Sequence, residues 1–181
     1  QLGVPFLALV VSPVQSAAIM LPILIVMDMV GLWSWRGFRD MTTLKIMLPG
    51  AMLGIFIGYL TARIVSDDAV VLIVGLIGLW FAIRSLMPNE AARGPGKAQN
   101  APVGGFWGAV AGFTSFVAHA GGAPYQIYTM PLKQDPKLYT GTSTVFFAIV
   151  NAVKLVPYFA LGQFDATNLS LSAVMFPLAV I

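Results

Sequence analysis

The stretch GGFWGAVAGFTSFVAHAGGAPYQIYTMPLK, from Gly104 to Lys133, decides the fold. It is an apolar segment that is broken in its middle by HAGGAP, from His119 to Pro124. Because a hydrocarbon core holds no water, unwound backbone is tolerated there only where it is buried in protein or lines a cavity. In transporters, broken helices aim their amide and carbonyl ends at the substrate. The stretch therefore predicts a membrane transport protein.

The composition supports a lipid environment and excludes several classes of site. Of the 181 residues, 58% are apolar and only 9% are charged, whereas soluble domains have about 25% charged residues. The basic residues lie between apolar runs rather than in one patch, so we expect no nucleic-acid partner. The chain has no cysteine and one histidine, so we expect no disulfide, no metal site and no cofactor.

Five further apolar runs are long enough for transmembrane helices, which need about 20 residues. We therefore expect an all-α integral membrane protein that crosses the bilayer several times. The expected helices are approximately Pro13–Trp33, Thr42–Val65, Asp68–Met87, Tyr139–Leu161 and Asn168 onward.

Two halves of the chain look like copies. Val4-Pro5 matches Met130-Pro131 at an offset of 126, and Asp40-Met41-Thr42 loosely matches Asp165-Ala166-Thr167 at 125. This offset implies that both ends are truncated, with a broken segment missing before the first repeat and helices missing after the second. The expected units are a first repeat at 1–87, a cytoplasmic linker at 88–103 and a second repeat at 104–181.

The basic residues favour one path for the broken segment. If residues 104–131 form a hairpin that returns to the side it left, nearly all Lys and Arg side chains lie on one side, with Arg63 alone opposite. Positive charge accumulates on the cytoplasmic side. We therefore expect a re-entrant hairpin, inverted repeats, a cytoplasmic linker and location in the inner (plasma) membrane.

Gly50, Gly54 and Gly58 repeat at every fourth position of one expected helix. Small residues at this spacing let helices approach closely. The pattern predicts either packing within the chain or a homodimer face.

Two charged residues lie inside expected helices. An ammonium in the membrane is costly and needs a partner or water, so Lys154, with Asn151 one turn earlier, predicts part of an anion path. The alternative is a structural ion pair. Asp28 is the carboxylate of the helix at 13–33 and is a candidate for proton coupling, because burial can raise a carboxyl pKa. A paired, purely structural Asp28 is the other interpretation.

The break itself supplies further candidate binding residues. His119 could donate to an anion, titrate near neutral pH or cap the broken helix. Gly121 and Gly122 leave their amides open to a ligand. Gly141-Thr142-Ser143 is expected to open the next helix, where free amides favour an anion. Ser115 near His119 has no orienting acid, so we do not expect an enzyme.

These residues also carry a family resemblance. Gly112-Phe113-Thr114-Ser115, His119-Ala120-Gly121-Gly122, Met130-Pro131 and Gly141-Thr142-Ser143 resemble the sulfite exporter TauE/SafE family, as do Ser12-Pro13 and Asp28 in the first half. The resemblance implies a permease with duplicated halves that moves sulfite, sulfonates or thiosulfate. The glycine break and the Gly-Thr-Ser turn would then be site elements. The family's glycine run is often longer than the two glycines here, which leaves the substrate open.

We therefore expect a secondary permease for a small sulfur oxyanion that works by alternating access, with proton coupling as an option. Two alternatives remain: a permease for organic carboxylates, and a non-transporting membrane scaffold that recruits partners through the Gly50, Gly54 and Gly58 face.

Overall fold

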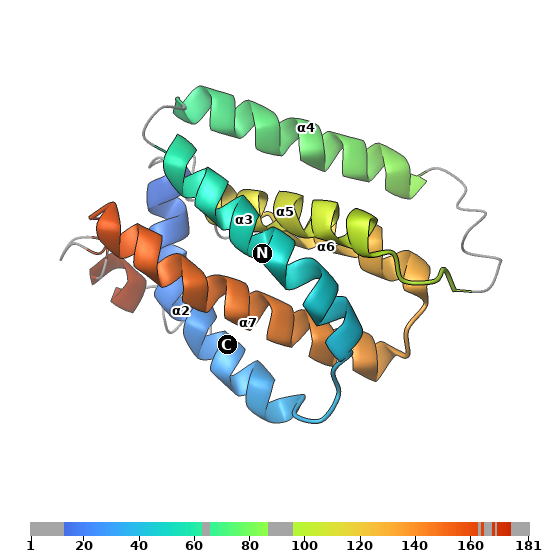
Figure 1. The fold of residues 1–181 in the computed structure, drawn as a ribbon. Helices are drawn as coiled ribbons and strands as arrows, with labels where there is room; N and C mark the ends of the chain where they lie inside the picture. Colours follow the sequence, from blue (N-terminus) through green and yellow to red (C-terminus); the bar gives the residue numbers. More distant parts are fainter. Residues whose placement is uncertain are drawn as a thin grey trace.

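The computed structural model describes residues 13–62, 66–86, 96–162, 164, 168 and 170–174. In this part of the chain every regular element is helical. Figure 1 shows a bundle in which α4 lies on the outside, along α5, while α2 and α7 cross on the opposite side. The elements are α2 (Pro13–Ser34), α3 (Met41–Thr61), α4 (Asp67–Leu86), α5 (Ala101–Ala118), α6 (Gly122–Thr129), the 3₁₀ turn η2 (Met130–Leu132) and α7 (Pro136–Ala160).

Helices form at four of the five expected apolar runs, as α2, α3, α4 and α7. In the described residues α2, α3, α5 and α7 are long and apolar enough to cross a bilayer, judged by length and composition. Residues 168 and 170–174 are also helical, and Ser172 Oγ donates to the Ile19 carbonyl of α2 at 2.6 Å. The prediction of an all-α, multi-pass membrane protein is thus confirmed.

The glycine pattern of α3 serves packing within the chain. A Cβ atom added at Gly50 would lie 2.0 Å from the Gly105 carbonyl oxygen, and one at Gly54 would lie 2.0 Å from that of Ala109. Later residues of α3 contact later residues of α5, so the two helices run parallel, and their backbones are in contact. A Cβ at Gly58 would meet the Phe116 ring of α5. The homodimer face predicted for these glycines is therefore wrong, because α5 already covers them.

The broken segment is a helical hairpin that returns to the end at which it began, in agreement with the path that the basic residues favoured; its re-entrance in the bilayer stays a prediction. α5 runs away from the linker, the chain turns at 119–121, and α6 with η2 runs back. The Asn100 amide donates to Tyr128 Oη at 3.2 Å, and the Lys97 amide donates to the Pro131 carbonyl at 2.9 Å. The end of the hairpin therefore lies beside its beginning.

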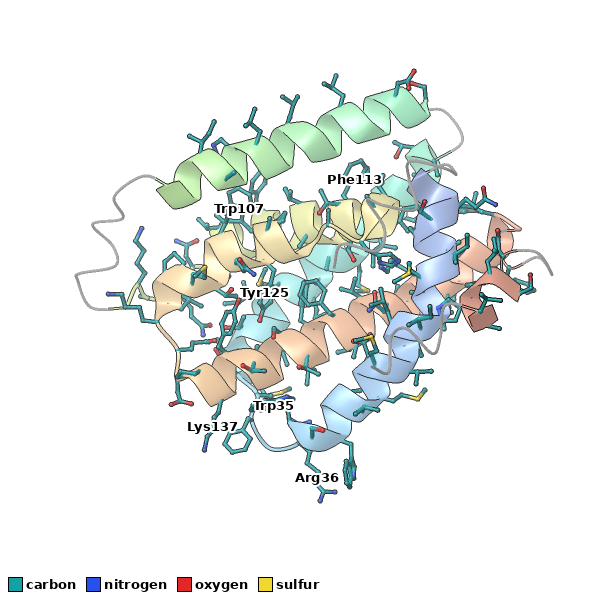
Figure 2. All side chains as sticks on the ribbon, turned by 180° about the vertical axis from the view of Figure 1, so that it is seen from behind. Trp35, Arg36, Trp107, Phe113, Tyr125 and Lys137 are labelled. Carbon is teal, nitrogen blue, oxygen red and sulfur yellow. The ribbon has the colours of Figure 1, made fainter. Side chains whose placement is uncertain are left out.

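A polar cluster joins three loops at the linker end of the bundle. Asp40 Oδ2 accepts hydrogen bonds of 2.6 Å from Thr43 Oγ1, Gln99 Nε2 and Gln134 Nε2. We call these four residues the Asp40 cluster. Figure 2 shows Trp35, Arg36 and Lys137 along the lower edge of that view, where α2 ends and α7 begins.

The duplication stays a prediction. Gly37 and Gly162, which follow α2 and α7, both have positive φ angles, of 96° and 67°. The two glycines are 125 residues apart, the offset at which Asp40 matches Asp165. Val4-Pro5, Asp165-Ala166-Thr167 and the linker up to residue 95 lie outside the described residues.

Candidate functional site at the helix break

The break begins with an unusual backbone conformation at His119. This residue ends α5 with φ 51° and ψ 27°, a left-handed conformation that costs most non-glycine residues energy. Its amide donates to the Ser115 carbonyl at 3.1 Å, and the Ala120 amide donates to the Thr114 carbonyl at 3.1 Å. The turn thus satisfies carbonyls in the last turn of α5, as a helix C-terminus requires.

Side chains of α7 complete this helix end. Lys154 is fully buried, and its Nζ donates to the Ser115 carbonyl at 3.0 Å and to Ser115 Oγ at 3.1 Å. One turn later, Tyr158 Oη donates to the Phe116 carbonyl. A cation near a helix C-terminus is stabilised by the helix dipole. Lys154 and Tyr158 therefore cap α5 from a different helix.

His119 supplies the third acceptor for Lys154. The two nitrogens, Lys154 Nζ and His119 Nδ1, lie 2.7 Å apart, and His119 Nε2 lies 2.8 Å from the Ala17 carbonyl oxygen of α2. An ammonium can only donate and a carbonyl can only accept. With Lys154 as an ammonium, the arrangement therefore assigns His119 as a neutral imidazole with its proton on Nε2. All three donors of Lys154 are used, and none of the three acceptors is a carboxylate.

The next helix begins immediately beside this group. Gly121 precedes α6, and no side chain caps this helix end. A Cβ added at Gly121 would lie 2.6 Å from the Ala111 carbonyl oxygen and 2.8 Å from Ser115 Cβ, so only glycine fits against α5. The first-turn amides of α6, from Gly122 and Ala123, have no partner within the helix. They form the positive end of the α6 dipole.

Asp28 and Asn151 form a second polar contact in the bundle. Asn151 Nδ2 donates to Asp28 Oδ2 at 2.6 Å, joining α7 to α2. The structural ion pair considered for Lys154 is thus not formed with Asp28. Asn151 and Lys154 are one turn apart on α7. The Asp28 carboxylate, which is bound to Asn151, and the Lys154 ammonium therefore lie in one polar region.

The Gly-Thr-Ser turn lies elsewhere than expected. α7 begins at Pro136 and not at Tyr139, because Asp135 caps its first turn by accepting from the Lys137 amide at 2.9 Å. Gly141, Thr142 and Ser143 are therefore inside the helix and do not offer free amides, which corrects that part of the prediction. Gly141 packs against the Phe38 carbonyl, and Thr142 Oγ1 accepts from the Asp40 amide at 2.8 Å. Their binding of substrate stays a prediction.

The contacts of two residues in the site were not predicted. Ser115 binds Lys154 through both its carbonyl and its hydroxyl, and Tyr158 binds the α5 carbonyl next along the chain. Their spacing was informative, since Ser115–His119 and Lys154–Tyr158 are both pairs four residues apart. Such pairs lie on one helix face. What the sequence lacked was the rotation that turns these two faces toward each other.

This architecture defines the class as a multi-pass helical membrane protein with a broken helical hairpin. The sulfite exporter TauE/SafE family model matches residues 2–181. The chain therefore belongs to the TauE/SafE family, as the resemblance in the sequence predicted. No curated protein and no solved structure matches it significantly.

Proposed function

We propose that the protein is a secondary permease that carries a small sulfur oxyanion, such as sulfite, a sulfonate or thiosulfate, by alternating access. Family membership supports a membrane transporter for sulfite or related anions. The observation that carries the proposal is the helix break, where α5 ends and α6 begins beside the buried Lys154. The linker end faces the cytoplasm in this proposal, and the membrane is the inner (plasma) membrane.

The chemistry at the break suits an anion. The α6 amides, the His119 ring and the Lys154 ammonium are hydrogen-bond donors or become donors when the local bonds rearrange. Uncapped helix N-termini bind anions through their amides and their dipole. Asn151 lies one turn from Lys154 and would contact the anion on the other side, where its amide now binds Asp28.

An organic carboxylate is the second candidate substrate, because the same donors bind a carboxylate as readily as a sulfur oxyanion. Competition separates the two. Sulfite, methanesulfonate, thiosulfate and acetate would each be added against one labelled substrate. Stronger inhibition by the sulfur anions supports the proposal, and stronger inhibition by acetate moves the assignment to carboxylates.

The surface that the scaffold alternative requires is already covered. It required Gly50, Gly54 and Gly58 to face a partner protein, but α5 occupies that face. Transport is therefore the function that the described structure supports best.

The direct test is uptake of radiolabelled thiosulfate into proteoliposomes that contain the full protein, with and without a pH gradient. Gly121→Ala places a methyl group against the Ala111 carbonyl and Ser115, so we expect at least about a tenfold loss of flux, as small displacements at a binding site produce. Gly105→Ala is the matched control on α5, because its Cβ would have only an ordinary contact, 3.9 Å from the Ile46 carbonyl oxygen. Folded wild-type protein without saturable uptake of thiosulfate or sulfite would refute the proposal.

A further inference from the structure

With Lys154 as an ammonium, the contact between Lys154 and His119 can exist only while His119 Nδ1 carries no proton. Lys154 Nζ lies 2.7 Å from His119 Nδ1, and an ammonium donates but never accepts. The bond therefore requires a lone pair on Nδ1. A proton added to His119 must go to that nitrogen, since the Nε2 proton already points at the Ala17 carbonyl.

Protonation would change what both side chains offer. The bond from Lys154 to Nδ1 breaks, because two N–H donors then face each other. One Nζ–H and the new Nδ1–H become free donors directed into the same space. Two like charges at this separation repel strongly in a buried site. The state is stable only if something negative enters between them.

We propose that His119 and Lys154 take up a proton and the transported anion together, with the anion replacing the hydrogen bond between the two side chains. This inference rests on the proposed function and names how its binding site is regulated. The proton adds to Nδ1, the anion accepts from Nδ1–H and Nζ–H, and no other group is consumed. Each bound anion thus brings one proton, and release of either favours release of the other.

The surroundings of the pair fit this role. Among the described residues, Lys154 on α7 is the charged group in contact with His119, and Asp28 on α2 is the charge that acts on Lys154. α5 contributes the Ser115 hydroxyl and carbonyl, which hold Lys154 in both states. α6 contributes its first-turn amides, which follow Gly121. A Cβ added at Gly121 would lie 2.8 Å from Ser115 Cβ. Ser115 is neutral and the first turn of α6 has no acidic residue, so neither element adds a competing negative charge.

The chain offers an unusually clean test, because it contains a single histidine. With ¹⁵N-labelled histidine and no histidine tag, the ring nitrogens report tautomer and protonation directly. Without anion we expect the neutral Nε2–H form at neutral pH. Adding thiosulfate at constant pH is expected to increase the protonated fraction, because linked binding is reciprocal.

Two variants sharpen the test. His119→Asn keeps a side-chain acceptor, tolerates the left-handed backbone and does not titrate. Wild-type flux should change by up to about tenfold per pH unit, the limit for one coupled proton. Across the same pH range we expect the flux of His119→Asn to vary by less than about twofold. Lys154→Gln removes the cation, and thiosulfate should then leave the His119 spectrum unchanged.

The outcomes separate this inference from the proposed function. Suppose that flux is saturable but thiosulfate does not change the His119 spectrum, or that His119 without anion is the Nδ1–H tautomer. Either result overturns the inference and leaves the proposed permease function standing. A wild-type pH profile in His119→Asn also overturns it. Absence of both flux and thiosulfate response from folded protein defeats both. A thiosulfate-dependent rise in protonation that Lys154→Gln abolishes supports the shared site.

Discussion

Asn151 Nδ2 donates a 2.6 Å hydrogen bond to Asp28 Oδ2, and this bond ties α7 to α2 inside an apolar bundle. Asn151 is 5% exposed, and Asp28 is partly buried. A carboxylate in this position depends on its donor, because few polar groups of the bundle and little water can replace it.

Asn151→Leu is therefore expected to destabilise the protein by about 1–3 kcal/mol, the cost of leaving a buried polar group without its partner. The exchange Asp28→Asn with Asn151→Asp restores a carboxylate–amide pair and should recover most of the loss. Thermal unfolding in detergent measures all three proteins. An Asn151→Leu midpoint equal to that of the wild type would show that the bond contributes nothing to stability.

The α3–α5 interface predicts a large effect from one methyl group. Gly54→Ala directs a Cβ to 2.0 Å from the Ala109 carbonyl oxygen. Backbone cannot move aside as a side chain can, so the helices must separate, at a cost of about 1–3 kcal/mol or more.

The matched control is Gly75→Ala on α4, where an added Cβ meets nothing within 4 Å. There alanine is expected to be neutral or to stabilise by about 0.5–1 kcal/mol, since it has the higher helix propensity. Size-exclusion profiles and unfolding midpoints of both variants provide the comparison. Equal behaviour of the two variants would argue against direct backbone contact between α3 and α5.

The Asp40 cluster predicts a pH dependence of stability. Partial burial raises the pKa of Asp40, but the hydrogen bonds from Thr43, the Thr42 amide and Gln99 outweigh it and hold the pKa below its usual value. A depressed carboxyl pKa contributes stability above the pKa of the unfolded state, and this stability is lost as the pH falls through the folded-state value.

We therefore expect wild-type stability to fall on acidification below the ordinary carboxyl range, and Asp40→Asn to reduce that fall. The measurement is the unfolding midpoint as a function of pH. Asp68→Asn, an exposed position at the start of α4, serves as the control and should keep the wild-type acid dependence. If the unfolding midpoint of Asp40→Asn falls at low pH as much as that of the wild type, the Asp40 cluster does not cause the acid dependence.

The sequence predicted the elements better than their contacts. Apolar length located the membrane helices to within a few residues, since a helix in lipid must satisfy its backbone internally over the thickness of the hydrocarbon core. The asymmetry of Lys and Arg favoured a segment that returns to the side it left, because a single crossing would have divided those charges between the two sides, and the hairpin of α5 and α6 agrees with that path. Both arguments depend on the bilayer around the protein and not on how the helices pack against one another.

The partners of Lys154 could not be predicted in the same way. Helical spacing places Asn151, Lys154 and Tyr158 on one face of α7, but it does not say which helix that face meets. Only packing decided that Lys154 reaches the end of α5 while Asn151 reaches Asp28. The start of α7 was a different error. Asp135-Pro136 is an N-cap followed by proline at the first helical position, a readable start signal that a search for apolar residues passes over.

Tyr158 offers a test of the α5 cap that leaves the packing intact. Tyr158→Phe removes the hydroxyl that binds the Phe116 carbonyl and keeps the ring stacked on Phe116, with centroids 4.9 Å apart. The carbonyl loses its side-chain donor, so we expect a loss of about 1 kcal/mol. Faster amide hydrogen exchange in the last turn of α5 should accompany it. Exchange as slow as in the wild type would show that the hydroxyl is dispensable for holding this turn.

The re-entrant path is testable by cross-linking, since the chain has no native cysteine. Gln99 and Gln134 both donate to Asp40 Oδ2 at 2.6 Å, so their side chains meet at one atom from the two ends of the hairpin. Cysteines at 99 and 134 should join through a short bis-maleimide and react with impermeant reagents from the same side of the membrane. A pair at 99 and 61 is the control, because the 21 residues of α3 separate Asp40 from Ala62, a distance of about 30 Å along a helix. Labelling of 99 and 134 from opposite sides would mean that residues 104–131 cross the membrane once, and the inverted arrangement of the halves would then have to be abandoned.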